Sequence, residues 1–233
     1  MKWNRSQHLT IAGALLGLLA GCTDRNIPTA ASNQPTLAFD ASASLTSVVT
    51  DPSGDAAWNR NTGPGAEAKV PAYLDIVTAA VSKKGGTLVF TMSLADVLPA
   101  SPQPASGGLG TYDWFFELDT DPATFPSGKD GVFPQNQALP IEFFVAVEWD
   151  GVQFTGVLFD LRPLLTGSPM ILTPVAFSIA GTQIQLSVDA TALGDPSIFG
   201  WAAATCARHA HYPSDGVQCL DRAPDGGFAA WPQ

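Results

Sequence analysis

Aspartates near the start of the region that follows residue 44 have the side chains and the spacing to bind a cation. Asp51 and Asp55 begin and end the segment DPSGD, and Asp75 precedes an apolar run further along the chain. Calcium takes about six to eight oxygen ligands, which three carboxylates, backbone carbonyls and water could supply together. The alternative is an Asx-type turn in which Asp51 and Asp55 accept backbone N–H groups. The sequence therefore predicts either a structural calcium site or a turn.

Three aromatic residues in or beside predicted loops are candidates for ligand binding. Trp58, Tyr112 and Trp231 stand outside the apolar strand faces, whereas Trp149 and Trp201 fall on such faces. A flat ring can stack on the apolar face of a sugar while polar groups hold the hydroxyls. The three residues are therefore the expected carbohydrate contacts, although loop aromatics also cap the edges of cores.

The cysteines near the C-terminus predict a covalent link. Cys206 and Cys219 form an even pair once Cys22 is assigned to lipid, and an exported protein folds where disulfides persist. The alternative is a zinc site that adds His209 and His211. Their His-Ala-His spacing is unlike that of common structural zinc sites. A disulfide is therefore the prediction.

Catalytic motifs are absent from the sequence. It contains no G-x-S-x-G elbow, no H-E-x-x-H and no phosphate-binding glycine loop. Glu142 and Glu148 could suggest a glycosidase pair, but six residues of extended strand separate them by about 20 Å, which is too far. The sequence therefore predicts a non-catalytic protein.

The N-terminus has the pattern of a lipoprotein signal peptide over residues 1–21. Lys2 and Arg5 precede the apolar stretch LTIAGALLGLLAG, which is too short to span a bilayer comfortably. The motif LAGC then resembles a bacterial lipobox, in which Cys22 is acylated and becomes the mature N-terminus. Thr23 in the next position favours the outer membrane of a Gram-negative bacterium. Residues 22–44 are rich in Ala, Ser, Thr and Pro, which predicts a flexible tether.

The charge of the chain restricts its partners. The formal net charge is −10, and loss of Lys2 and Arg5 with the signal peptide makes it about −12. Such an acidic surface argues against nucleic acid and against docking on anionic lipid through charge. The bilayer is therefore expected as a partner only through the acyl chains on Cys22.

Residues 45–233 show the period-two alternation of strands. The segment 74–94 predicts a hairpin around Gly85 and Gly86, and the segment 175–188 predicts another around Gly181. Further strands are expected at 45–50, 111–119 and 198–206. Together with the hairpin described in the next paragraph, these segments make about nine strands joined mostly by short turns. Such a series of antiparallel strands predicts an all-β antiparallel sandwich.

The clearest hairpin signal is IEFFVAVEWDGVQFTGVLFD. Asp150-Gly151 is a favoured two-residue turn, which would pair Trp149 with Val152 and continue through successive partners. One face is then wholly apolar and is expected in the core: Phe143, Val145, Val147, Trp149, Val152, Phe154, Gly156 and Leu158. The opposite face is mixed, so it is either partly covered or a place where a ligand sits: Glu142, Phe144, Ala146, Glu148, Gln153, Thr155, Val157 and Phe159.

Several motifs occur in an order that is similar to one known superfamily. They are DPSGD, GPG, LDIVTAAV, TLVFTMSLAD, FFELDTDP, DATALGDPSIFGWAAATC and DRAPDGG. The chain resembles, over residues 45–227, the β-sandwich superfamily of family-nine carbohydrate-binding modules, DOMON domains and glucodextranase C-terminal domains. The resemblance implies a non-catalytic sandwich that binds sugar or, in some DOMON domains, haem, with a structural calcium ion in several members.

The expected function is that of a lipid-anchored binding domain. Carbohydrate is the favoured ligand, with Trp58, Tyr112 and Trp231 as its contacts. The alternative is a structural or assembly lipoprotein whose mixed sheet face contacts a protein of the cell envelope.

Overall fold

The computed structural model describes residues 45–58, 69–104, 109–121, 141–209 and 217–232. The predicted signal peptide, the acylated Cys22 and the tether over 22–44 lie outside these ranges, so their assignment stays a prediction. Within the described ranges, no helix has both the length and the apolar character needed to cross a bilayer.

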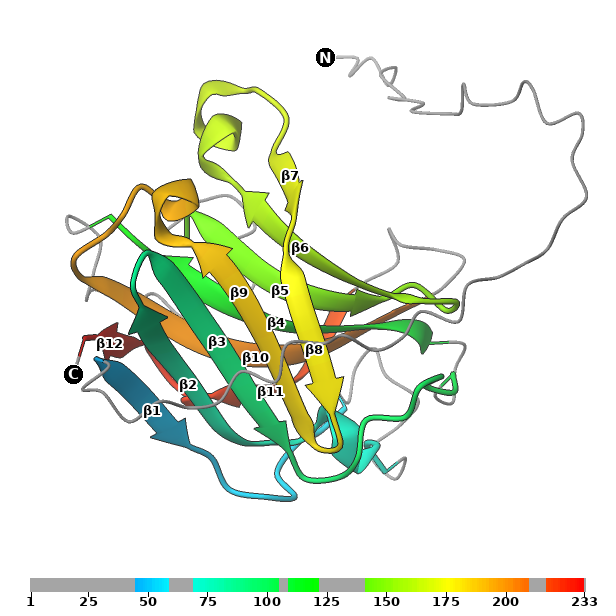
Figure 1. The fold of residues 1–233 in the computed structure, drawn as a ribbon. Helices are drawn as coiled ribbons and strands as arrows, with labels where there is room; N and C mark the ends of the chain where they lie inside the picture. Colours follow the sequence, from blue (N-terminus) through cyan, green and yellow to red (C-terminus); the bar gives the residue numbers. More distant parts are fainter. Residues whose placement is uncertain (1–44, 59–68, 105–108, 122–140, 210–216, 233) are drawn as a thin grey trace, which may run out of the picture. The chain divides into compact units, whose positions relative to one another are not determined.

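The described residues form two antiparallel sheets that face each other, as Figure 1 shows. The smaller sheet has five strands in the order β1 (Thr46–Thr50), β2 (Ile76–Lys84), β3 (Thr87–Leu94), β9 (Gln183–Asp189) and β8 (Ala176–Ala180). The larger sheet runs in the order β11 (Val217–Ala223), β10 (Phe199–His209), β4 (Leu109–Asp119), β5 (Phe143–Trp149), β6 (Phe154–Asp160) and β7 (Ile171–Pro174), and β12 (Ala229–Trp231) also pairs with β10. The predicted all-β sandwich is confirmed.

Three short 3-10 turns complete the regular structure of the described residues: η1 (Ala72–Leu74), η2 (Arg162–Thr166) and η3 (Ala190–Leu193). The turn η2 ends at Gly167, whose φ of 75° lies in the left-handed region that glycine tolerates. Its Leu164 is 41% exposed.

The core lies between the two sheets and follows the predicted alternation. In β3, Leu88, Phe90, Met92 and Leu94 are buried while the residues between them are partly exposed. From the larger sheet, Trp201 packs on Phe116, with ring centroids 6.0 Å apart, and Phe116 packs on Phe90 across the sandwich at 5.2 Å. Removing these side chains from water is the main stabilising contribution to such a fold.

The hairpin of β5 and β6 has a different register from the predicted one. Trp149 pairs with Phe154, so Val152 is not a core residue but is 83% exposed. The reason is the Asp150 carboxylate, whose Oδ1 accepts the N–H of Val152 at 2.7 Å and of Gln153 at 2.8 Å. These bonds favour a four-residue turn. The register moves by two residues, which leaves each remaining side chain on its predicted face.

The larger sheet has strands that the sequence pattern did not predict. They are β7, β11 and β12, of which β7 and β12 are short. The strand β11 reads VQCLDRA, in which polar residues interrupt the alternation of apolar ones. Pairing with the preceding strand β10 stabilises β11 and β12 as strands.

Cys206 and Cys219 form the predicted disulfide between β10 and β11. The two cysteines are direct partners in the antiparallel register. Because both sulfur atoms are used in this bond, the alternative zinc site with thiolate ligands is wrong.

The chain crosses from one sheet to the other between β7 and β8. Gly156 of β6 lies beneath this crossing, and its carbonyl accepts the N–H of Val175 at 3.0 Å. A Cβ atom at Gly156 would stand 2.5 Å from the carbonyl oxygen of Val175 and 2.8 Å from a ring carbon of Phe177. The crossing therefore requires a residue without a side chain at this position.

We expect Gly156→Ala to destabilise the domain, because its added methyl group meets backbone at a distance that no relaxed structure allows. Overpacking of this kind costs about 1–3 kcal/mol of unfolding free energy. Urea denaturation followed by tryptophan fluorescence measures the change. Gly86→Ala is the matched control, because a Cβ there meets nothing within 4 Å. Equal midpoints for the two variants would contradict the packing described here.

Candidate functional site

The segment that contains Asp51 and Asp55 lies between β2 and β11. Asp51 N–H donates to the carbonyl of Val77 at 3.0 Å, and Ala57 N–H donates to that of Leu220 at 2.8 Å. The segment therefore joins the two sheets at one edge, next to the residues that follow Cys219.

A glycine turns this segment toward Asp75. Gly54 has a φ of 92°, and its N–H donates to Asp75 Oδ2 at 2.7 Å. Asp75 is only 4% exposed. The predicted approach of the DPSGD segment to Asp75 is thus present in the structure.

Five aspartates gather here in two overlapping groups. Carboxylate oxygens of Asp55, Asp75 and Asp221 lie within 4.8 Å of one another, and so do those of Asp51, Asp55 and Asp225. Asp55 belongs to both groups, so the structure brings it together with each of the other two predicted residues. Asp221 in β11 and Asp225 after it were not predicted, although the motif DRAPDGG that contains them was noted. We call these five residues the aspartate cluster.

Two oxygens of the aspartate cluster have no hydrogen-bond partner within the described residues. They are Asp51 Oδ2 and Asp75 Oδ1, and both are buried. A buried acceptor without a partner is costly, so such atoms call for an explanation. A cation would supply one, because it binds the lone pairs that no N–H or O–H group occupies.

The electrostatics of the aspartate cluster favour added positive charge. Burial, with the nearby carboxylates of Asp221 and Asp55, raises the pKa of Asp51 to about 7. Burial also raises the pKa of Asp221 to about 6, with Asp55 and Asp75 acting in the same direction. These carboxylates hold protons more tightly than in the unfolded chain because their charges repel in a partly dry site.

The donor set fits calcium. All five candidate ligands are carboxylates, which suit hard cations such as calcium, whereas zinc and copper sites draw on nitrogen and sulfur. Asp55, Asp75 and Asp221 would hold an ion that links the DPSGD segment, the start of β2 and β11, and Asp51, Asp55 and Asp225 form the second group that could hold one. Such an ion would serve the structure of the domain, and its presence stays a prediction.

The predicted sugar-binding aromatics are not available for stacking, and this corrects the expectation that they are exposed. Trp58, Tyr112 and Trp231 are 5%, 0% and 2% exposed. Trp231 stacks on Phe199 with centroids 5.1 Å apart, and the Tyr112 hydroxyl donates to the carbonyl of Gln103 at 2.7 Å. Period-two alternation could not place these rings, because the contacts that bury them come from distant segments.

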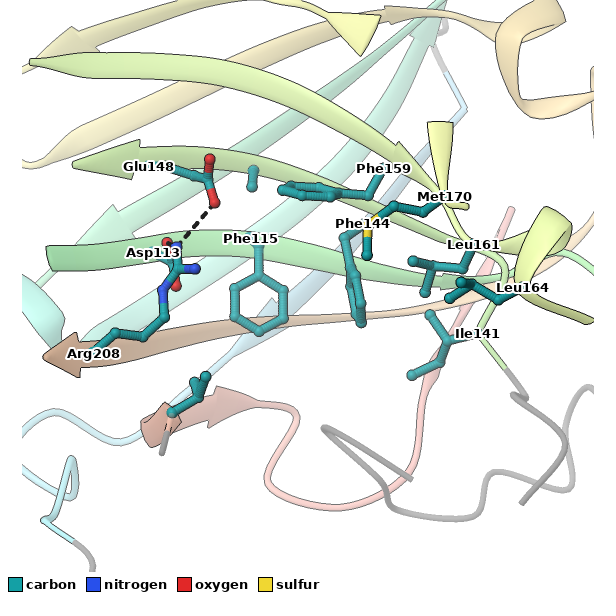
Figure 2. Close-up of a pocket in the computed structure, with 12 residues that line it drawn as sticks. Asp113, Phe115, Ile141, Phe144, Glu148, Phe159, Leu161, Leu164, Met170 and Arg208 are labelled. Carbon is teal, nitrogen blue, oxygen red and sulfur yellow. Dashed lines mark hydrogen bonds and ion pairs between the residues drawn. The ribbon is translucent and has the colours of Figure 1, made fainter. Parts of the chain in front are cut away.

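A groove of about 350 Å³ opens on the outer face of the larger sheet, the face turned away from the smaller sheet. We call it the outer groove, and Figure 2 shows it. Phe115, Phe144 and Phe159 come from three neighbouring strands, β4, β5 and β6. Leu161, Leu164 and Met170 line it around η2. This is the mixed face on which the sequence predicted either a cover or a ligand.

The floor of the outer groove is a second apolar cluster, separate from the core. Phe115, Ala146, Ala204 and Cys206 are its most buried members, at 5% exposure or less. Phe115 and Phe144 meet edge to face with centroids 5.4 Å apart. The exposed face of an antiparallel sheet in a sandwich is usually polar. An apolar floor on this face is therefore a candidate binding surface.

One end of the outer groove is charged. Asp113 of β4 stands directly opposite Glu148 of β5, an arrangement that repels when nothing neutralises it. Arg208 of β10 contacts both, and its Nη2 lies 3.0 Å from Glu148 Oε1 and hydrogen-bonds to Asp113 Oδ1. Burial raises the pKa of Asp113 to about 6 although Arg208 acts in the opposite direction. We call these three residues the charged end.

The sequence pattern did not identify most of the charged end. Asp113 and Arg208 lie far apart in the chain, and only the pairing of β4 with β10 brings them together. Glu148 was placed on the correct face. Asp113 and Arg208 are charged residues within largely apolar strands, and this was the signal that could have identified them.

Comparison of the chain with models of protein families, with curated proteins and with solved structures finds no match. The resemblance to the superfamily of family-nine carbohydrate-binding modules and DOMON domains therefore stays a prediction. The sandwich itself rests on the structure alone.

The aspartate cluster predicts that calcium stabilises the domain most at alkaline pH. The raised pKa values of Asp51 and Asp221 mean that protonation stabilises the fold at low pH, and that this contribution is lost as pH rises through about 6 to 7. At pH 8, calcium at a hundredfold its dissociation constant should raise Tm by about 5 to 10 °C relative to chelator. At pH 5 the rise should be smaller, because protons compete with the ion.

Differential scanning calorimetry measures this effect, and Asp221→Asn should reduce the rise at pH 8. Asp195→Asn is the control, because Asp195 is exposed and pairs with Lys83 away from the cluster. An identical Tm in calcium and in chelator at pH 8 would remove the calcium site.

Proposed function

We propose that this protein is a lipid-anchored, non-catalytic binding domain of the cell envelope and that its ligand occupies the outer groove. Acylation of Cys22 would hold the domain at the membrane, with the outer membrane as the expected location. The observation that carries the proposal is the apolar groove on a sheet face where polar side chains are usual.

The size of the outer groove suits a small ligand or a short segment of a larger one. Small-molecule sites have volumes of about 300–1,000 Å³ and are lined mainly by apolar and aromatic side chains with a few polar groups. The outer groove has about 350 Å³, apolar walls and one charged end. Its composition matches that description.

The lining favours an apolar ligand over the carbohydrate expected from the sequence. A sugar needs polar partners along its length, but the polar side chains of the outer groove gather at the charged end. Its aromatic residues are phenylalanines, which offer no polar group. With Trp58, Tyr112 and Trp231 buried, the support for carbohydrate is weaker than the support for a hydrophobic molecule.

A protein partner in the envelope is the second candidate. Met170, Ile171 and Leu172 are between 43% and 57% exposed and continue from the rim of the outer groove along β7. β7 is the edge strand of its sheet. An exposed aliphatic edge of this kind suits contact with another chain.

A hydrophobic probe tests the proposal directly. The mature chain from residue 23, exported behind a cleavable signal so that the disulfide forms without acyl chains, should bind N-phenyl-1-naphthylamine saturably with a rise in fluorescence. Leu164→Asp and Met170→Asp should each weaken binding about tenfold or more, because a charge in an apolar site must be desolvated. Both residues are partly exposed, so the fold should tolerate the changes.

Val152→Asp is the matched control, because Val152 is 83% exposed in the turn between β5 and β6 and does not line the outer groove. Its probe affinity should equal that of the parent chain. Absence of saturable binding by the parent chain would contradict the proposal. If an envelope protein co-purifies and Ile171→Asp alone abolishes this, the second candidate is the better one.

A further inference from the structure

The charged end of the outer groove holds more negative than positive charge. Asp113 and Glu148 are both within reach of one guanidinium, that of Arg208. A single nitrogen of Arg208, Nη2, makes both contacts. With both carboxylates ionised, the three side chains carry a net charge of −1. Among the residues that line the outer groove in the described part of the chain, Arg208 is the only cationic one.

Glu148 is the more accessible of the two carboxylates of the charged end. Its side chain is 27% exposed, against 12% for Asp113. Its carboxylate accepts one hydrogen bond from Arg208 through Oε1. A charge-assisted bond from an ammonium group of a ligand to this carboxylate would be stronger than a neutral one.

An aromatic ring stands next to this charge. Figure 2 shows Phe115 beside Asp113 and Arg208, with Phe159 and Phe144 following toward the apolar end. The face of an aromatic ring attracts a cation that lies within about 6 Å of its centroid. Phe115 therefore extends the preference for positive charge from the charged end into the apolar part of the outer groove.

We propose that the ligand of the outer groove is a cationic amphiphile, with its ammonium group at Glu148 and Asp113 and its apolar body along Phe115, Phe159 and Phe144. The inference rests on the proposed function and adds the chemical class of the ligand. Glu148 and Phe144 are four residues apart on one strand, a span of about 13 Å that an extended octyl chain roughly covers.

A fatty carboxylate is the competing occupant, because Arg208 could in principle receive it. It would place a third negative group beside Asp113 and Glu148, and the one guanidinium is already shared between those two. Like charges at such short range in a partly dry site repel strongly. A protonated amine neutralises the net negative charge of the charged end, whereas a carboxylate increases it.

Three probes of equal length separate these occupants. Octylamine, octanol and octanoate share the apolar body and differ in the charge of the head group. Calorimetric titration of the mature chain at pH 7.5 should show octylamine binding about tenfold more tightly than octanol, and octanoate more weakly than octanol. Glu148→Gln should remove most of the advantage of octylamine, which means that the ratio of the octylamine affinity to the octanol affinity falls toward one.

Asp160→Asn is the control variant, because Asp160 pairs with Arg162 and does not line the outer groove. It should retain the full preference for octylamine. If octanoate binds as tightly as octylamine, or if Glu148→Gln does not reduce the preference, the head-group inference is overturned and the apolar site stands. If neither the three octyl probes nor N-phenyl-1-naphthylamine binds, both the head-group inference and the proposed function fail.

Discussion

The antiparallel pairing of β10 with β4 is the interaction on which the rest of the domain depends. It joins a strand from the middle of the chain to one near its end, with Trp201 opposite Leu118 and Cys206 opposite Asp113. On the inner face this pair presents Trp114, Phe116 and Trp201 to the other sheet. On the outer face it sets Asp113 beside Arg208 and Phe115 beside Ala204. One ladder of backbone hydrogen bonds thus supports both the core and the outer groove.

The strand β11 extends this arrangement to the aspartate cluster. Its disulfide to β10 and a register shift next to Cys206 determine which way its side chains turn. Asp221 then turns to the start of β2, where its carboxylate accepts the N–H of Ile76. The next residue, Arg222, turns to the outer face and pairs with Glu117, which is fully buried. Because successive side chains of a strand point to opposite faces, β11 contributes Asp221 to the aspartate cluster and Arg222 to the outer face of the sheet.

Both candidate sites contain carboxylates whose pKa values burial has raised, but the two sites differ in how the charge is balanced. In the charged end, Arg208 forms ion pairs with both Asp113 and Glu148 and offsets part of their repulsion. No described basic side chain forms an ion pair with the aspartate cluster, and two of its buried oxygens have no partner. The first arrangement suits a ligand with one positive charge and an apolar body. The second suits a divalent ion that holds three segments together.

The sequence by itself determined the local features of this protein. Alternation of apolar and polar residues identified the hairpins of β2 with β3 and of β8 with β9, including the buried face of β3, because neighbouring strands joined by a tight turn need no distant partner. The pairing of Cys206 with Cys219 also followed from their number and the expected compartment. The approach of the DPSGD segment to Asp75 was one of the two alternatives that the sequence left open.

Only the tertiary structure decided the features that depend on contacts between distant segments. Packing against the sheets buried Trp58, Tyr112 and Trp231. The register of the hairpin of β5 and β6, in contrast, was changed by a local contact, that of the Asp150 carboxylate with the two residues that follow Gly151. Asp221 and Asp225 joined the aspartates near the start of the domain because β11 pairs with β10 and lies against the DPSGD segment. Arg208 met Asp113 because β10 pairs with β4. Alternation tells which residues share a face of one strand, but strand order and register decide which faces meet.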